Sequence, residues 1–232
     1  MTTAPKPITD IVDLHHHDYK GDAELAAAHM AGMRALIHKA TQGKDWKDPR
    51  FKAAMEHAQA LGLLRGAYHF ASNSASGVVQ ADWFLERVAL AVGTVADDVL
   101  LVLDWENNPD TESGVMSVEN ARLFVQRVHG VTGRWPLLYS FTHFLKGTLP
   151  GRDDVLANCP LWQSQFGERP SRPASATWSK IDLWQYTNGA DGPHDKVTFP
   201  RRTGGFAKTG QDRSAFFGTA DELAAWWASA GR

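Results

Sequence analysis

The sequence predicts an α/β fold, namely an irregular TIM-like barrel of eight strands with about five outer helices. Short apolar runs alternate with amphipathic helical patterns through the first half of the chain, and this order is typical of parallel strands joined by helices. The candidate strands recur at a spacing of roughly 22 to 35 residues, which favours a closed barrel over an open sheet. With 232 residues the chain has room for one barrel, and no repeat marks a second domain.

Each strand and helix is placed from its apolar pattern. The expected strands lie at 8–14, 35–41, 63–70, 98–106, 135–140, 159–166, 180–187 and 212–218, and the expected helices at 22–33, 48–62, 74–90, 117–130 and 220–230. Pro49 and Gly62 bound the second helix, and Ser117 and Gly130 bound the fourth. After residue 140 the segments between strands are rich in Gly, Pro and Ser, so we expect loops there. The chain is then a single domain, residues 1–232, with its core at about 11–218 and a C-terminal helix at about 220–230.

The composition excludes several kinds of partner and site. The net charge of −2 provides no basic surface for nucleic acid or an anionic membrane. No window approaches the roughly 18 consecutive apolar residues that a membrane span requires. The only cysteine, Cys159, rules out an intrachain disulfide and a multi-cysteine zinc site. We therefore expect no nucleic-acid partner and no membrane insertion, and we expect the chain to be a monomer.

Polar side chains gather near the ends of the predicted strands. A barrel of parallel strands brings their C-terminal ends to one rim, where barrel enzymes hold their reactive groups. Buried carboxylates are costly unless they are paired, so several of them at strand ends require a functional explanation. The candidates are Asp13, Lys39, Tyr68 or His69, Asp104, Glu106, Tyr139, Gln163 or Gln165, Gln185 and Asp212.

The segment VLDWE, residues 102–106, carries the strongest chemical signal. Side chains alternate along a strand, so Asp104 and Glu106 face one side while Trp105 faces the other. The two Cα atoms would lie about 6.6 Å apart, and carboxyls at that distance raise the pKa of the less solvated one. Cleavage of a glycosidic bond uses this combination. An acid protonates the leaving oxygen, and a carboxylate stabilises the sugar cation or directs the nucleophile.

A set of motifs spread over most of the chain resembles a known family. In order they read DLHHHD, KATQGKDWKDPRF, GLLRGAYHF, QADWFL, VLDWE, PLLYS, PLWQSQF, IDLWQYT and DRSAFFG, from about residue 11 to 218. This combination resembles glycoside hydrolase family 25, the muramidases also called Chalaropsis-type lysozymes. The resemblance implies an irregular eight-stranded barrel with five outer helices. It also implies hydrolysis of the β-1,4 bond between N-acetylmuramic acid and N-acetylglucosamine in peptidoglycan glycan strands.

The resemblance also assigns roles to individual residues. Glu106 corresponds to the general acid and Asp104 to its partner, which orients or stabilises the reacting sugar. Asp13 and Asp212 match two further acidic positions. No metal and no organic cofactor is implied. The residues that the resemblance places in substrate binding are Tyr68, His69, Tyr139, Trp162, Gln185 and Tyr186. For His69, the residues themselves favour a buried histidine that is hydrogen-bonded to a neighbour.

Three motifs depart from the family pattern. The first usually reads D-V-S-H-x-Q/N-G, whereas this chain has DLHHHDY at residues 13–19. Gln42 replaces the acid of a KATEG motif, and Asp212 follows a long basic loop in place of a short glycine-rich turn. These changes affect the expected detail of substrate binding more than the expected class of reaction.

Two alternatives of other classes fit part of the pattern. A metal-dependent barrel hydrolase would use His15 and His17 with Asp212, although the middle strands lack the further histidines or lysine that such sites need. A cell-wall sugar-binding module without catalysis would not require the pair Asp104 and Glu106. Stoichiometric zinc would support the first alternative, and unchanged activity of Glu106→Gln would contradict the role of Glu106 as general acid.

The N-terminal segment bears on where the protein acts. MTTAPKPITD lacks a basic segment followed by an apolar one, so we expect synthesis in the cytoplasm without a signal peptide. Action on the bacterial cell wall would then require release through a holin-type partner or a secretion system. We expect the catalytic face to provide wall targeting, helped by the loop that contains Arg201 and Arg202.

Overall fold

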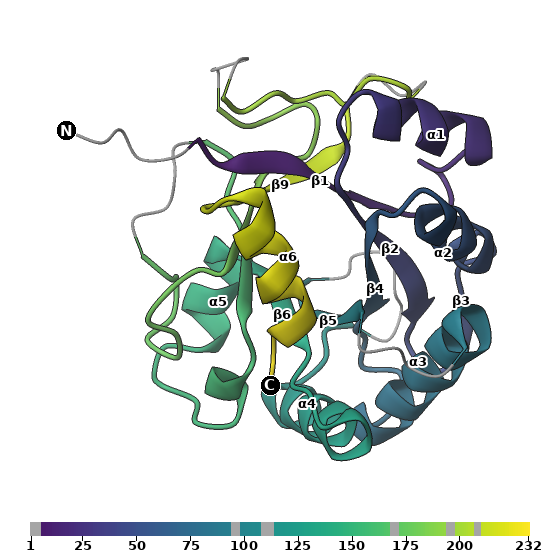
Figure 1. Ribbon diagram of the computed structural model, residues 1–232. Helices are drawn as coiled ribbons and strands as arrows, with labels where there is room; N and C mark the ends of the chain where they lie inside the picture. Colours follow the sequence, from purple (N-terminus) through teal and green to yellow (C-terminus); the bar gives the residue numbers. More distant parts are fainter. Residues whose placement is uncertain (1–5, 94–97, 108–113, 168–171, 194–197, 207–209) are drawn as a thin grey trace.

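Eight strands close into a barrel in the computed structural model, which describes residues 6–93, 98–107, 114–167, 172–193, 198–206 and 210–232 (Figure 1). The barrel strands are β1 (Ile8–Leu14), β2 (Ala35–Gln42), β4 (Leu64–Phe70), β5 (Val99–Asp104), β6 (Leu137–Phe141), β7 (Leu161–Ser164), β8 (Leu183–Thr187) and β9 (Asp212–Phe216). Their spatial order is β1-β9-β8-β7-β6-β5-β4-β2, and a further pairing of β1 with β2 closes the sheet. The predicted eight-stranded α/β barrel is confirmed.

The last strand runs in the opposite direction to the others. All other neighbouring strands of the barrel pair in parallel, whereas β9 is antiparallel to both β8 and β1. Because β9 is reversed, its first residue, Asp212, lies at the rim that the C-terminal ends of the parallel strands form. Asp212 therefore reaches the expected rim from the start of a strand and not from its end.

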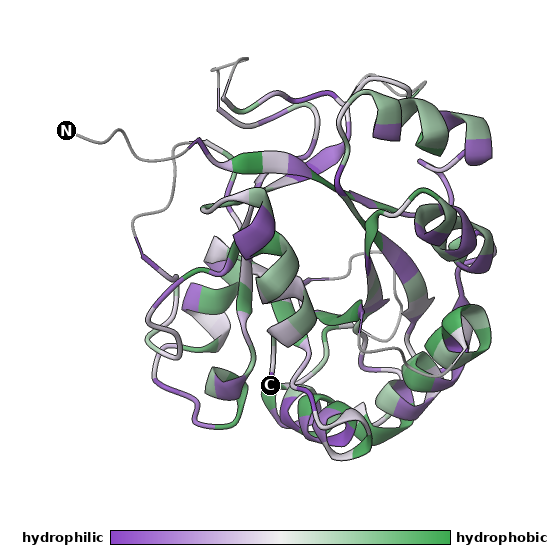
Figure 2. Cartoon of the chain, viewed as in Figure 1, coloured by the Kyte–Doolittle hydropathy of each residue, from purple (hydrophilic) through white to green (hydrophobic). Residues whose placement is uncertain are grey.

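Helices cover the outside of the barrel. They are α1 (Asp22–Met30), α2 (Phe51–Ala60), α3 (Gly77–Val92), α4 (Val118–Thr132) and α5 (Thr142–Thr148). In Figure 1, α1 to α4 form an arc along one side, and α5 lies on the other. Hydrophobic and hydrophilic residues alternate along α3 and α4 (Figure 2), as in helices that pack one face on a core. None of the helices in the described ranges has the length and apolar character needed to cross a bilayer.

The structure corrects several element boundaries. The fourth helix continues through Gly130 to Thr132 and ends at Gly133, whose φ of 70° is the left-handed conformation that favours glycine. The second helix begins at Phe51, later than expected. The region after residue 140 is not all loop, because α5 forms there and buries Phe144 and Leu145. A short strand, β3 (Trp46–Lys47), and a 3₁₀ helix at Leu156–Asn158 were also not expected.

Two apolar layers stabilise the fold, one inside the barrel and one between the barrel and the helices. Side-chain alternation divides each strand between them. The inner layer contains Ile11, Ala35, Ile37, Leu100, Val102, Leu137, Trp162 and Leu183. The outer layer takes the intervening residues, such as Val12, Leu36, Leu101, Leu103 and Leu138, together with the buried faces of the helices.

A sixth helix, α6 (Ala220–Ser229), closes one end of the barrel. It crosses in front of the strands in Figure 1 and places Leu223 and Trp227 in the inner apolar layer. The Trp227 Nε1 donates a hydrogen bond of 2.7 Å to the carbonyl of Arg65, near the start of β4. The N-terminal ends of the parallel strands are therefore covered, and the opposite rim is the one available for a site.

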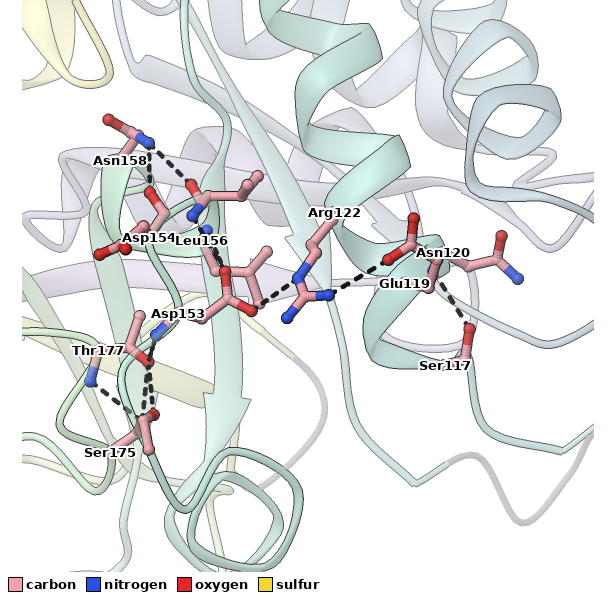
Figure 3. Close-up of polar contacts among 12 residues, drawn as sticks. Ser117, Glu119, Asn120, Arg122, Asp153, Asp154, Leu156, Asn158, Ser175 and Thr177 are labelled. Atoms are coloured by element: carbon pink, nitrogen blue, oxygen red, sulfur yellow. Dashed lines mark hydrogen bonds and ion pairs between the residues drawn. The ribbon is translucent and has the colours of Figure 1, made fainter.

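A buried carboxylate connects α4 to the segment that follows α5 (Figure 3). The Arg122 Nε donates to Asp153 Oδ2 at 2.8 Å, while Asp153 Oδ1 accepts the backbone N–H groups of Val155 and Leu156 at 3.0 and 2.9 Å. The side chain of Asp153 is only 2% exposed. This carboxylate thus stabilises the turn before the 3₁₀ helix, which leads into β7.

Candidate active site

A cavity of about 460 Å³ opens at the rim formed by the C-terminal ends of the parallel strands. It brings together side chains that are up to 199 residues apart in the sequence, from Asp13 to Asp212. Its lining residues are Asp13, His15, His16, His17, Lys39, Gln42, Trp46, Tyr68, Phe70, Asp104, Glu106, Tyr139, Trp162, Gln185 and Asp212. All four predicted carboxylates are among them, together with four of the six predicted substrate-binding residues.

The alternation of side chains explains why these residues meet. On several strands the last apolar residue of the inner layer is followed, two residues later, by a polar residue on the same face, as Ile11 is followed by Asp13 and Val102 by Asp104. Strand register completes the site. Asp13 is paired directly with Asp212 across the antiparallel β1–β9 pair, and Asp104 is level with Tyr139 on β6.

Burial and neighbouring carboxylates raise the pKa values of three carboxyl groups, Asp13, Asp104 and Glu106. Burial, followed by the charge of Asp212, raises the pKa of Glu106 from 4.5 to about 7, although Lys39 acts in the opposite direction. Burial and the charge of Glu106 raise the pKa of Asp104 well above its usual range. The pKa of Asp13 is also raised, by burial and by Asp212. Near neutral pH the group therefore retains protons, because like charges in a poorly solvated site cannot all ionise.

A chain of hydrogen bonds fixes one side of the site. The Tyr139 hydroxyl donates to Gln185 Oε1 at 2.8 Å, and Gln185 Nε2 donates to Asp13 at 3.1 and 3.2 Å to its two oxygens. The Trp162 ring packs edge-on against Tyr139 at 4.7 Å between centroids, and its Nε1 donates to Ser214 Oγ at 2.9 Å. These contacts hold the aromatic and carboxylate groups in place before any ligand binds.

Two predicted substrate-binding residues do not line the cavity. His69 and Tyr186 are each one residue away from a cavity residue, Tyr68 and Gln185, so alternation turns them to the other face of their strands. His69 is fully buried and contacts Thr41 Oγ1 at 2.8 Å and Gln80 Oε1 at 3.1 Å. It is therefore the buried, hydrogen-bonded histidine that the residues favoured.

The position of Tyr186 follows from the same alternation. Its ring is fully buried and packs with Trp184 and Phe199, and its hydroxyl donates to the carbonyl of Pro200 at 2.6 Å. Tyr186 thus holds the long loop before β9 and does not face the cleft.

The three histidines lie in a turn after β1, and all of them line the cavity. The His15 Nε2 lies 3.1 Å from Asp18 Oδ2, while the His16 Nδ1 lies 3.0 Å from Asp48 Oδ2. The buried Asp48 also accepts the backbone N–H of His16 at 2.9 Å. Within the described ranges, no three His, Cys, Asp or Glu side chains are arranged to hold a metal ion. His15 therefore makes its contact within the turn, with Asp18, whereas His16 connects the turn to Asp48.

Four residues, Lys39, Gln42, Trp46 and Phe70, line one side of the cavity. The sequence listed Lys39 among the strand-end candidates but gave none of the four a catalytic or binding role. Lys39 donates to Gln42 Oε1 at 2.6 Å, and its ammonium lies 5.0 Å from the ring of Trp46 and 4.4 Å from that of Phe70. Trp46 reaches this position because β3 folds back antiparallel onto the end of β2. Lys39 follows Ile37 on the inner face, which agrees with its choice as a strand-end candidate, whereas the return of β3 left no such signal.

Gln163 and Gln165, the two remaining strand-end candidates, are separated by the structure. Gln163 is buried, and its Oε1 accepts the backbone N–H of Ala174 at 2.8 Å. Gln165 lines a second cavity that adjoins the first. The arginine of the basic loop also has a structural role, because the Arg201 guanidinium donates to the carbonyls of Ala190, Gly192 and Pro193.

Comparison with known proteins agrees with this site. The chain is 32% identical over 206 residues to Lysozyme M1 of Streptomyces globisporus; the match covers 81% of this chain and 66% of that protein, just under two thirds. It is 35% identical over 185 residues to the N,O-diacetylmuramidase of Chalaropsis sp, covering 72% of this chain and 86% of the relative. The crystal structure of the bacterial lysozyme from Streptomyces coelicolor superposes with a TM-score of 0.74 at 27% identity, covering 94% of this chain and 96% of that one.

The family assignment rests on a match over most of the chain. The sequence model for glycosyl hydrolases family 25 matches residues 12–193, which include the end of β1, all of β2 to β8 and the residues Asp13, Asp104 and Glu106. Asp212 lies beyond the matched residues, and its place in the site comes from the pairing of β9 with β1. Sequence, fold and relatives agree: the chain belongs to glycosyl hydrolases family 25.

Proposed function

We propose that this chain is a muramidase that hydrolyses the β-1,4 bond between N-acetylmuramic acid and N-acetylglucosamine in peptidoglycan. The observation that carries the proposal is the pair Asp104 and Glu106 at the floor of the cavity, with the pKa of Glu106 raised to about 7. Glycosidases of this general type need a carboxylic acid that is still protonated at working pH and a second carboxyl nearby.

In the proposed reaction Glu106 is the general acid. Its carboxyl proton moves to the glycosidic oxygen as the bond between that oxygen and the sugar C1 breaks. A water molecule then adds its hydroxyl to C1, and its proton returns to a carboxylate of the site, so that one bond is hydrolysed without a net change in the enzyme. Asp104 stabilises the positive charge that develops on the sugar ring, or orients the acetamido group of that sugar.

The other cavity residues are proposed to bind and orient the glycan. Asp13 fixes Gln185, and Gln185 fixes the hydroxyl of Tyr139, which presents polar groups to sugar hydroxyls. Tyr68, Trp162 and Trp46 provide aromatic surface of the kind that commonly packs against sugar rings. Asp212 adds negative charge beside Glu106 and so favours the protonated acid.

The proposed site of action is the bacterial cell wall. We propose that the chain acts as a monomer and reaches the wall after release through a holin-type partner or a secretion system. Expression of the protein alone, followed by assay of the medium from intact cells, tests the release step. Protein found in the medium without lysis would contradict both routes.

The reaction is tested by identifying the new chain ends. Purified peptidoglycan is digested with the wild-type protein and with Glu106→Gln, and the fragments are analysed by mass spectrometry. A muramidase releases fragments with reducing-end muramic acid. Glu106→Gln is expected to reduce the amount of these fragments by about 100-fold or more. Reducing-end glucosamine or free peptides would refute the proposed bond, and binding without any fragments would support the non-catalytic sugar-binding module.

A further inference from the structure

A second cavity of about 660 Å³ adjoins the first on the side of α5. The two cavities share Glu106, Tyr139, Gln185 and Asp212, so the proposed general acid lies where they meet. We name the second cavity the α5 arm; outside the shared floor its main lining residues are Phe141, Thr142, His143, Lys146, Gln165 and Phe166.

The α5 arm carries positive charge on its outer wall. His143 and Lys146 are one helical turn apart on α5, which places them on the same side of the helix, while Phe144 and Leu145 between them are buried. Both side chains are exposed, and within the described ranges neither forms a hydrogen bond or an ion pair. They are therefore available to a ligand that enters the arm.

Phe141 and Phe166 give the arm an apolar wall, and hydrogen bonds connect the segments around it. Phe166, on the loop after β7, is 40% exposed although it is a large apolar side chain. The Thr142 hydroxyl lies 3.2 Å from the Ser164 carbonyl and 3.2 Å from Gln165 Oε1, which connects the start of α5 to this loop. The arm thus presents cationic groups and an apolar wall on a preformed frame.

Charge is distributed differently in the first cavity. There the ammonium of Lys39 is bonded to Gln42 and lies over the rings of Trp46 and Phe70, and its charge lowers the pKa values of Asp104 and Glu106. That cation acts on the reacting carboxyls. His143 and Lys146 line the α5 arm and not the first cavity, so the Lys146 charge and the His143 imidazole face a different part of the ligand.

We infer that the α5 arm binds the acidic peptide attached to muramic acid, with Lys146 and His143 contacting its carboxylates and Phe166 its apolar side chains. This inference rests on the proposed muramidase function. The glycan itself carries no free carboxylate once the lactyl group is joined to the peptide, so the peptide is the source of negative charge in the substrate. The acidic floor of the site repels that charge, whereas the outer wall of the arm attracts it.

The test compares two forms of one substrate. The values of kcat/KM are measured on solubilised peptidoglycan glycan that retains its peptides and on the same glycan after an amidase has removed them and the lactyl carboxyls that this frees have been converted to amides. The ratio of interest is kcat/KM on the glycan with peptides divided by kcat/KM on the glycan without them. For the double variant His143→Ala, Lys146→Ala, this ratio is expected to fall about three- to tenfold, mainly through a higher KM for the glycan with peptides, as for the loss of exposed charge contacts. Lys146→Arg should restore much of the ratio lost in Lys146→Ala.

The control is Lys52→Ala, which removes an exposed lysine from α2, away from both cavities. It is expected to keep the wild-type ratio, and thermal unfolding checks that every variant is folded. A wild-type ratio of one, or a ratio that the double variant leaves unchanged, would overturn the inference while the muramidase function stands. Failure of the wild-type protein to cleave either glycan would overturn the proposed function itself.

Discussion

Glu106 differs from an ordinary glutamate because burial and the charge of Asp212 raise its pKa from 4.5 to about 7. If its proton drives bond cleavage, kcat/KM should fall about tenfold per pH unit above this pKa. The positive charge of Lys39 lowers the pKa of Glu106, so Lys39→Met should raise that pKa. The alkaline limb of the pH profile should then lie at higher pH in the variant than in wild type. The measurement is the pH profile of kcat/KM, with Lys52→Met as control. An unshifted alkaline limb in Lys39→Met would contradict this coupling.

Asp13 and His16 lie close together in sequence and in the cavity, yet their contacts differ. Asp13, inside the barrel, accepts a hydrogen bond from Gln185. His16 lies in the turn after β1 and contacts Asp48. Asp13→Asn is expected to lower kcat by about 100-fold or more, since it replaces the carboxyl that accepts the hydrogen bonds of Gln185 and so disturbs the positioning of the site. His16→Ala is expected to keep kcat within about fivefold, because its polar contact lies in the turn. Turnover of soluble glycan decides between them, and the reverse order would restore the metal hypothesis.

At the scale of elements, two adjacent aspartates show how much depends on what a side chain touches. Asp153 is buried and accepts three hydrogen bonds that hold the 3₁₀ turn to α4 (Figure 3). Asp154 is 87% exposed, and among the described contacts its side chain pairs only with Arg152. Asp153→Ala should lower the free energy of unfolding by about 2–3 kcal/mol, because buried N–H donors lose their acceptor.

Asp154→Ala is the matched control, and it should stay within about 0.5 kcal/mol of wild type. Urea denaturation of the two variants measures the difference. Asp153→Asn retains an acceptor oxygen and is expected to fall between them. Equal stability of the two alanine variants would show that the turn does not depend on the buried carboxylate.

At the scale of the whole molecule, the proposed site is expected to reduce stability at alkaline pH. The folded pKa of Glu106, about 7, exceeds its ordinary value of 4.5, so the folded state binds more protons than the unfolded state in this range. Stability therefore decreases as pH rises from about 4.5 to 7. Glu106→Gln does not titrate, and it should exceed wild type by about 1–3 kcal/mol at pH 8.

The comparison is made by urea denaturation at pH 8 and pH 4. At pH 4 the two proteins should be equally stable, because the carboxyl is protonated in both states. Glu56→Gln, on the exposed side of α2, should show little change at either pH. The same advantage of Glu106→Gln at both pH values would mean that packing, and not ionisation, distinguishes the variant.

Much of the fold and part of the site could be predicted from local pattern. The apolar runs defined all eight strands and the long helices, since burial on both faces leaves a continuous apolar signal, as in β5. Side-chain alternation correctly placed Asp104 and Glu106 on one face. Applied equally to β4 and β8, the same rule would have placed His69 and Tyr186 outside the cavity.

The sequence by itself determined the strands and their order along the chain, the barrel class, the family and the carboxyl pair in VLDWE, because each apolar run and each motif consists of residues close together in the chain. Only the tertiary structure decided the rest. The reversal of β9 sets Asp212 opposite Asp13, the return of β3 brings Trp46 over Lys39, and α5 adds a cationic wall. These contacts join segments far apart in the sequence, or depend on a short helix stabilised by burial. A local sequence pattern does not specify which distant segments will lie side by side in the folded barrel.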